Sequence, residues 1–348
     1  MLGFSVYLNH DLTNNQINLI ENMQQSGFKG IFTSLHIPED DEQAYLPRLK
    51  ELGGLCKKLK LSLTADISAD GLKKMGIELD DIQQLAEIGL TALRVDDGVL
   101  MSDVAKLSRQ MPIALNASTI SAEDVDELHR CHANFKQLEA WHNYYPRPET
   151  GLDDDWLKAK NQWLKTQGFT TMAFVAGDED LRGPIYAGLP TLESDRSEHP
   201  LAATLKLINH LAVDKVYIGD AGLSKRVRGQ FEAYFNGNTV QLTVQSSNEA
   251  LFESDWHNRP DVARDVVRLV EGRQRFTAVS PLQTASRPRG AITIDNERYG
   301  RYVGEFEIVK KTLAADPRVN VVGWVVPSDL ALLPWIGSNC PIRFIKKG

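Results

Sequence analysis

The sequence lacks the features of several specialised protein classes. Its 348 residues contain no apolar run of the roughly 18 residues that a membrane-spanning helix needs. It has three cysteines, Cys56, Cys131 and Cys340, which are far apart and form neither a metal-binding spacing nor an even disulfide set. No pair of histidines, or of histidine and carboxylate, has the spacing of metal ligands on one strand. These absences predict reduced thiols, no bound metal or other cofactor, and a cytoplasmic location.

The sequence also lacks an excess of positive charge, because 46 Asp and Glu against 39 Lys and Arg give a formal net charge of -7. This balance argues against nucleic acid or an anionic membrane as a partner, although it permits a local basic pocket for a phosphorylated small molecule. Met1 leads directly into 3–8, without a basic segment or a long apolar run, so no secretory signal is predicted. Apolar residues make up 42% of the chain and charged residues 24%, which is typical of globular proteins.

Short apolar runs alternate with amphipathic stretches from the start to about residue 235. Each run has the length and composition of a buried strand, and the stretches between them have helical periodicity. The eight predicted strands are 2–8, 30–37, 61–67, 92–97, 113–116, 135–140, 171–176 and 215–220. Eight consecutive strand-helix units predict a (β/α)8 TIM-like barrel over residues 1–235. The alternative is a doubly wound open sheet, which lacks support because no Gly-rich dinucleotide loop follows the first strand.

The pattern changes over residues 236–348. Strand-like alternation occurs at 240–244, 291–294, 319–326 and 342–345, whereas 260–270 and 304–313 look helical. This region is predicted to form a separate, smaller α+β or closed β domain.

Polar or titratable side chains end each predicted strand of the barrel. In such barrels the C-terminal strand ends share one face, where substrate binds. The candidates are Tyr7, His36, Asp66, Asp96, Asp97, Asn116, His142, Asn143, Asp178, Arg182 and Asp220.

Asp66 and Asp96 are the predicted catalytic pair. Each follows an apolar run, and the two lie on neighbouring strands, so paired carboxylate chemistry is feasible. The alternative for Asp66 is a structural carboxylate that accepts backbone N–H groups or pairs with Arg94. Asp97 has the opposite parity to Asp96 and should point away from the interior.

Two arginines are candidates for binding phosphate, because loops after the seventh and eighth strands commonly hold phosphate in these barrels. Arg182 follows the seventh strand, and Arg196 lies further along the same connection. A guanidinium can bind phosphate through two hydrogen bonds, and surface ion pairing is the alternative for each.

The stretch 138–151 carries the densest set of candidate groups. Its two prolines make the loop after the sixth strand stiff and non-helical. Tyr145, Arg147 and Glu149 in this loop join His142 and Asn143 as predicted substrate contacts, while an ordered surface loop is the alternative.

Several stretches together resemble one bacterial family. They are Ile31–Glu39, Leu115–Thr119, His142–Leu152, Arg182–Pro184, Gly188–Glu193 and Ile292–Tyr302. Across nearly the whole chain, the sequence resembles the MupG-type 6-phospho-N-acetylmuramidases.

This resemblance implies a TIM-like barrel followed by a cyclophilin-like, mostly β domain. It also implies hydrolysis of the bond between N-acetylmuramic acid 6-phosphate and N-acetylglucosamine, a cytosolic step in cell-wall sugar recycling. The expected partner is therefore a phosphorylated amino sugar or disaccharide. Two alternatives are a barrel lyase or isomerase acting on a phosphorylated sugar, and a sugar-phosphate-binding barrel without catalysis. No lysine lies near the ends of the second to seventh predicted strands, which argues against Schiff-base chemistry.

The second domain contains its own polar cluster, with Asp295, Asn296 and Arg301 between a strand and a helical run. One interpretation is a turn and a helix cap with packed tyrosines. The other is that this domain covers the barrel mouth and contributes these residues to substrate binding, since closure excludes water from a reacting bond.

Overall fold

The computed structural model describes residues 1–34, 42–67, 81–95 and 99–348. The chain divides into two compact units, Met1–Arg228 and Gly229–Gly348, and each is described by itself. Among the described residues, no helix has the length and apolar character needed to cross a membrane.

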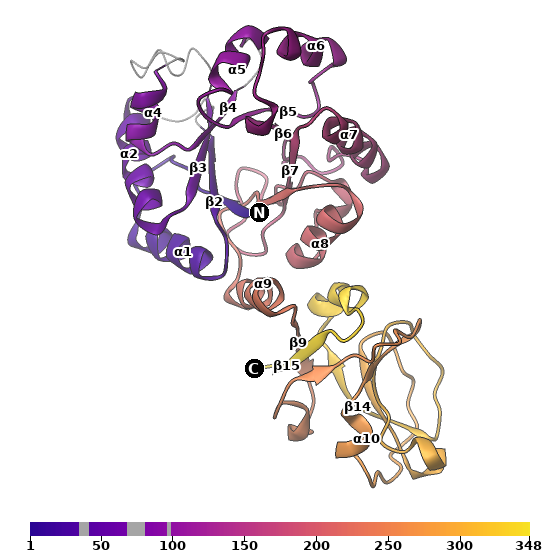
Figure 1. Cartoon of the computed structure of the whole chain (residues 1–348). Helices are drawn as coiled ribbons and strands as arrows, with labels where there is room; N and C mark the ends of the chain where they lie inside the picture. Colours follow the sequence, from indigo (N-terminus) through magenta and orange to yellow (C-terminus); the bar gives the residue numbers. More distant parts are fainter. Residues whose placement is uncertain (35–41, 68–80, 96–98) are drawn as a thin grey trace. The chain divides into compact units, whose positions relative to one another are not determined.

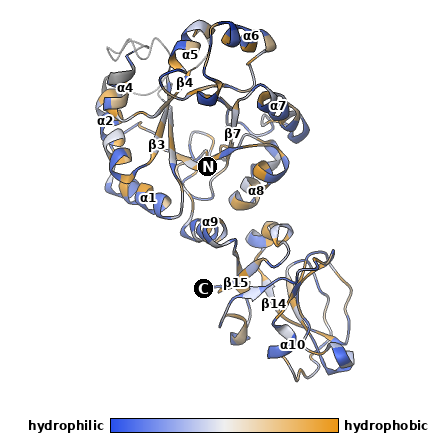
Figure 2. Cartoon of the chain, in the orientation of Figure 1, coloured by the Kyte–Doolittle hydropathy of each residue, from blue (hydrophilic) through white to orange (hydrophobic). Residues whose placement is uncertain are grey.

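The first unit is a closed barrel of eight parallel strands, as the sequence predicts. Helices that carry both hydrophobic and hydrophilic residues surround the strands (Figures 1 and 2). The strands are β1 (Leu2–Ser5), β2 (Gly30–Ser34), β3 (Ser62–Ile67), β4 (Ala92–Val95), β5 (Ile113–Asn116), β6 (Leu138–Trp141), β7 (Thr170–Val175) and β8 (Lys215–Ile218). The α-helices are α1 (Asn14–Gln25), α2 (Glu42–Leu59), α4 (Ile82–Ile88), α5 (Met101–Leu107), α6 (Ala122–Arg130), α7 (Asp154–Thr166) and α8 (Pro200–His210), and α9 (Lys225–Gly237) follows β8.

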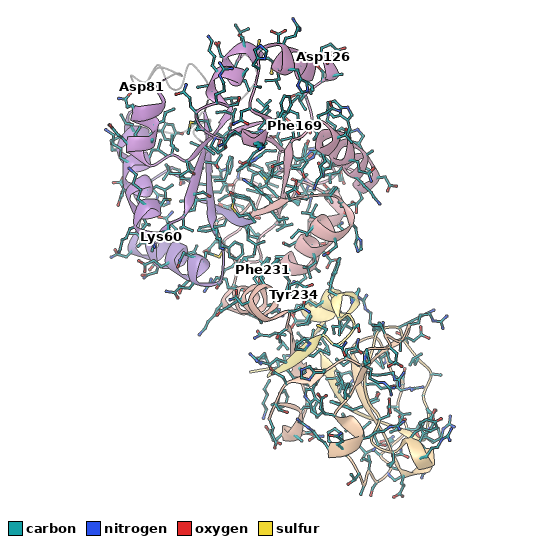
Figure 3. The ribbon with its side chains drawn as sticks, viewed as in Figure 1. Lys60, Asp81, Asp126, Phe169, Phe231 and Tyr234 are labelled. Atoms are coloured by element: carbon teal, nitrogen blue, oxygen red, sulfur yellow. The ribbon has the colours of Figure 1, made fainter. Side chains whose placement is uncertain are left out.

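Local signals set several helix starts. Thr13 and Ser121 begin α1 and α6 with complete capping boxes, in which the third helical residue bonds back to the cap. Figure 3 shows two polar residues, Lys60 and Asp126, at the periphery of the barrel, where both side chains are exposed.

Large aromatic residues fill the barrel interior. Phe32, Trp141, Phe174 and Tyr217 form one buried cluster, and their rings contact each other edge-on or tilted. Tyr217 requires glycine at Gly30, where an added Cβ would lie 2.1 Å from its hydroxyl. The interior is therefore a packed core, and polar groups gather beyond it at the C-terminal strand ends.

The second unit is built on one seven-stranded mixed sheet of order β10-β15-β9-β14-β12-β13-β11. Its strands are β9 (Val240–Gln245), β10 (Trp256–His257), β11 (Val266–Leu269), β12 (Ala291–Asp295), β13 (Phe306–Val309), β14 (Val319–Val325) and β15 (Pro341–Lys346). Short helices complete the unit: η3 (Glu249–Leu251), α10 (Gly272–Arg275), η4 (Glu297–Tyr302) and η5 (Pro327–Trp335). The predicted mostly β character is confirmed.

Two predicted helices in this unit are wrong. Residues 260–270 and 304–313 instead contain β11 and β13, which pair antiparallel with each other. The reason is visible in the residues, because both four-residue segments are rich in β-branched side chains and too short for helical periodicity to be informative.

Candidate active site

A hollow of about 290 Å³ opens at the C-terminal ends of β2, β3, β4, β6 and β7. Strand register explains its composition, since Ser34 pairs with Asp66 and Asp66 with Arg94, which places all three on the interior face. Its lining residues are Phe32, Ser34, Asp66, Arg94, Asn143, Tyr144, Tyr145 and Phe174.

A buried ion pair lies in this hollow. Arg94 Nη1 donates to Asp66 Oδ2 at 2.6 Å, and both residues are more than nine-tenths buried. Arg94 Nη2 donates to Asn143 Oδ1, so one guanidinium connects a carboxylate of β3 to the loop after β6. The pairing of Asp66 with Arg94, considered above as the structural alternative, is therefore present. The ion pair also fixes the Asp66 carboxylate at the wall of the hollow, which Asp66 helps to line. Asp96 and Asp97, like His36, lie outside the described residues.

Arg182 stands beside this hollow. Its Cζ lies 3.5 Å from the centroid of the Tyr7 ring, and its Nη1 donates to the Tyr144 hydroxyl at 3.3 Å. Within the described part of the chain, no carboxylate forms an ion pair with Arg182. The Tyr7 hydroxyl donates to the Gly219 carbonyl at 2.5 Å, and burial, followed by the neighbouring Tyr144, raises the pKa of Tyr7 well above its usual value. A guanidinium held between two tyrosines without a counterion can accept an anion.

The fully buried carboxylate of Asp220 holds the loop that carries Arg182. Its Oδ1 accepts the backbone N–H of Arg182 at 3.0 Å, and its Oδ2 accepts those of Gly177 at 2.9 Å and Leu189 at 3.0 Å. Asp220 is a predicted strand-end candidate, but its oxygens are used to shape this loop.

A second clamp holds the loop after β6. Arg196 Nε and Nη2 donate to the Glu193 carboxylate at 2.7 and 2.6 Å. Glu193 also accepts the backbone N–H groups of Glu149 and Gly151. The hydrogen bonds from Arg196, with help from these N–H groups, lower the pKa of Glu193 to about 2. Arg196 Nη2 reaches the carbonyl of Tyr145 at 3.0 Å as well, so this arginine, the second phosphate candidate, is engaged in holding the loop.

The loop residues predicted to touch substrate differ in position. Tyr145 lines the hollow, and its backbone N–H donates to the Pro190 carbonyl at 2.9 Å. Arg147 and Glu149 are exposed, and neither lines the hollow. Arg147 contributes its backbone carbonyl, which accepts the Thr150 hydroxyl at 2.6 Å.

Comparison with protein families identifies the chain. The model of the 6-phospho-N-acetylmuramidase N-terminal region matches residues 2–233, and that of the C-terminal region matches residues 236–345. The chain belongs to the 6-phospho-N-acetylmuramidase family.

Two solved structures resemble this family member over its full length. One is a conserved protein of unknown function from Enterococcus faecalis, 42% identical, with a TM-score of 0.93 and coverage of 100% of this chain and 97% of that one. The other is an uncharacterized B. cereus protein, 25% identical, with a TM-score of 0.73 and coverage of 99% of both chains. No curated protein sequence matches the chain.

The structure corrects the expectation for His142 as a substrate contact. His142 is fully buried on the outer side of β6, where its Nε2 lies 2.8 Å from Asn161 Oδ1 of α7. Burial lowers the pKa of His142 to about 4. Its neighbour Asn143 has the opposite parity and reaches the hollow, so the His-Asn pair of this muramidase-family chain divides between the two sides of the barrel wall.

Asn116 remains near the rim but is not among the residues that line the hollow. It is half-buried, and its Oδ1 accepts the backbone N–H of Ser118 at 3.0 Å. Its role toward substrate stays a prediction.

In the second unit, Asn296 makes the predicted turn and cap. It accepts the Arg298 N–H at 3.0 Å and donates to the Pro317 carbonyl and to Asn320. Arg301 is exposed, with its Nη2 2.9 Å from the Tyr302 hydroxyl. The expectation that these residues contribute to substrate binding stays a prediction.

Asp295, at the end of β12, is buried and raised in pKa to about 7, first by burial and then by the neighbouring Glu307 and Glu305. Between its ordinary pKa of 3.8 and about 7, the folded state holds a proton that the unfolded chain has released. The contribution of Asp295 to the free energy of unfolding is therefore most favourable at low pH, and it is lost as the pH rises through this window. We expect Asp295→Asn to raise the melting temperature of the second unit more at about pH 8 than at about pH 4.

Asp316→Asn provides a control of opposite sign. Hydrogen bonds from Arg318 lower the pKa of Asp316 to about 2, so its contribution is present above the unfolded pKa and lost in acid. This variant should lose stability near neutral pH. An Asp295→Asn effect that is equal at both pH values would contradict the assignment.

Five residues that line the hollow are absent from the predicted site components, namely Phe32, Ser34, Arg94, Tyr144 and Phe174, and two of them, Arg94 and Tyr144, bond other predicted site residues. Arg94 is considered from the sequence only as a partner for Asp66, although its interior parity on β4 matches that of Asp66 on β3. Tyr144, which packs on Phe174 with ring centroids 5.2 Å apart, lies in the singled-out loop but is not assigned a role. Strand parity is the signal that could have identified Arg94.

Proposed function

We propose that this chain hydrolyses the glycosidic bond between N-acetylmuramic acid 6-phosphate and N-acetylglucosamine, in the cytoplasmic reuse of cell-wall sugars. The observation that carries the proposal is the guanidinium of Arg182, for which the described residues supply no ion-pair partner, beside the hollow that contains Asp66. A phosphorylated sugar needs both a fixed cation and a carboxylate near the bond to be cut. Membership of the 6-phospho-N-acetylmuramidase family supports this choice of substrate.

In this proposal the negative charge of the Asp66 carboxylate faces the sugar ring whose glycosidic bond is cut. A glycosidase stabilises an oxocarbenium-like transition state and needs a second carboxyl group to protonate the leaving oxygen. Because Asp66 is bonded to the Arg94 guanidinium, it suits the nucleophile or charge-stabilising role better than proton donation. Asp96, which follows β4 in the sequence, remains the proposed second carboxyl group, and Asn143 and Tyr145 would position the sugar.

The direct test is incubation with the phosphorylated disaccharide and measurement of free N-acetylglucosamine. The unphosphorylated disaccharide is the matched substrate control. Release of N-acetylglucosamine with incorporation of solvent oxygen supports hydrolysis, whereas an unsaturated or isomerised product would support a lyase or isomerase. If the protein bound the phosphorylated disaccharide but formed no product, the result would support a sugar-phosphate-binding protein without catalysis.

Arg182→Ala should weaken use of the phosphorylated substrate. Loss of hydrogen bonds to a charged group costs about 1.5–3 kcal/mol, which corresponds to a fall in kcat/KM of roughly 10- to 100-fold. The unphosphorylated disaccharide should be affected much less. Arg182→Lys should recover part of the loss, because it keeps the charge without the planar fork.

Arg130→Ala is the control for this comparison, since Arg130 lies on the exposed side of α6 in an ion pair with Glu127. This variant should leave kcat/KM unchanged for both substrates. Equal losses for both substrates in Arg182→Ala would show that Arg182 supports the loop and does not bind phosphate.

A further inference from the structure

A second hollow, of about 370 Å³, lies between the end of β1 and helix α1. Tyr7 and Arg182 form part of its wall, and Asn9, His10, Gln16 and Asp180 also line it. This hollow is at the same end of the barrel as the Asp66 hollow, because Tyr7 and Arg182 follow the C-terminal ends of β1 and β7.

Arg182 belongs to the second hollow and not to the lining of the first. Its guanidinium lies over the ring of Tyr7, another lining residue of the second hollow. Its hydrogen bond to the Tyr144 hydroxyl reaches a residue that lines the Asp66 hollow. The Arg182–Tyr144 contact is therefore where the two hollows meet.

Two of the polar groups that line the second hollow, the Arg182 guanidinium and the Gln16 side-chain amide, can donate to a ligand. Gln16 Oε1 accepts from the Thr13 N–H at 3.0 Å and the Thr13 hydroxyl at 3.1 Å, which leaves the Gln16 Nε2 amide group to donate to a ligand. Asn9 and His10 are exposed at the rim. Among the described residues that line this hollow, the one carboxylate is that of Asp180, which is exposed to solvent that screens its charge.

We propose that this second hollow is the phosphate subsite, and that the substrate spans both hollows across the Arg182–Tyr144 contact. The phosphate lies against Arg182 and Gln16, while the bond to be cut lies against Asp66. Gln16, in the first turn of α1, is then a specificity-determining residue in addition to Arg182 of the loop after β7. The identity of the substrate rests on the proposed function, whereas phosphate binding at this subsite does not.

Gln16→Glu is the sharpest variant for this proposal. A glutamate keeps the acceptor for Thr13, because Glu at this position completes a capping box as Gln does. It removes the Nε2 donor and adds a negative charge facing the phosphate. Gln25→Glu makes the same chemical change at an exposed position of the same helix, outside the lining of the hollow.

Binding of inorganic phosphate and of glucosamine 6-phosphate should be measured by calorimetry on the full chain. We expect Gln16→Glu to weaken binding of glucosamine 6-phosphate about tenfold or more, and Gln25→Glu to leave it unchanged. Ala221→Phe, which fills the hollow with a large side chain, should abolish binding. Unchanged binding in both Gln16→Glu and Ala221→Phe would overturn the subsite.

The kinetic readout separates this inference from the proposed function. Gln16→Glu should lower kcat/KM for the phosphorylated disaccharide and leave that for the unphosphorylated one within about twofold. Equal losses for both substrates would also overturn the subsite. If the wild-type chain cleaves neither disaccharide, the proposed function fails, and the calorimetric comparison still decides whether the hollow binds phosphate.

Discussion

Asp66→Asn is expected to reduce turnover of the phosphorylated disaccharide by roughly 10²–10⁴-fold or more, the range in which a positioned acid, base or nucleophile contributes. The amide keeps the size of the carboxylate and an oxygen that can accept from Arg94, so the fold should remain intact. What it loses is the negative charge that a glycosidase directs at its transition state. The measurement is kcat with saturating substrate, together with a circular dichroism spectrum and a thermal melt.

A control substitution of another carboxylate shows whether the loss of turnover is specific to Asp66. Asp103→Asn alters an exposed carboxylate on α5 that pairs with Lys106, so it should retain full turnover. KM for the phosphorylated substrate should change little in Asp66→Asn if Asp66 acts mainly in the transition state. Near-normal turnover in Asp66→Asn would exclude Asp66 from the chemistry.

The barrel could be predicted because its signal is repeated. Each of the eight units places a short apolar strand before a helix with one apolar face, and a parallel sheet covered by helices is the arrangement that buries both. The β11 and β13 segments gave no such repetition. Each is four residues long, and its identity depends on pairing with the other, which lies more than thirty positions away in the sequence.

The site could be predicted in part, because strand ends and strand parity follow from sequence. Asp66, predicted at the end of the third strand, lines the hollow, and strand parity applied to β6 would have separated Asn143 from His142. The pairing of Arg94 with Asn143 across β4 and β6 depends on the register and closure of the barrel, which one sequence does not determine.

The two loop clamps show a different limit of sequence-based prediction. Asp220 and Glu193 look like rim carboxylates because loops after barrel strands are where functional residues gather. In the structure both carboxylates accept backbone N–H groups from loops distant in sequence. A buried N–H must find an acceptor, but which side chain supplies it depends on the final packing of the loops.

Asp220→Asn is expected to destabilise the barrel and to reduce discrimination in favour of the phosphorylated substrate. The two oxygens of the Asp220 carboxylate accept hydrogen bonds from three backbone N–H groups. The side-chain amide of asparagine has only one oxygen to accept them, and its NH₂ group is a donor that cannot accept from the other N–H groups. At least one of these buried or part-buried N–H groups therefore loses its acceptor, at a cost of about 1–3 kcal/mol. The melting temperature should fall by roughly 2–10 °C for a domain of this size.

The loss of discrimination follows from which backbone group is released. One orientation of the new amide frees the N–H of Arg182 itself, and the other frees Gly177 and Leu189 at the two ends of its loop. Either way the guanidinium becomes less well placed over Tyr7, so kcat/KM should fall more for the phosphorylated disaccharide than for the unphosphorylated one. Asp178→Asn is the matched control, because Asp178 lies in the same loop but is exposed and bonds Ser224. A purely structural role for Asp220 would lower the melting temperature and reduce both substrates in proportion, so the ratio between the substrates is the measurement that decides.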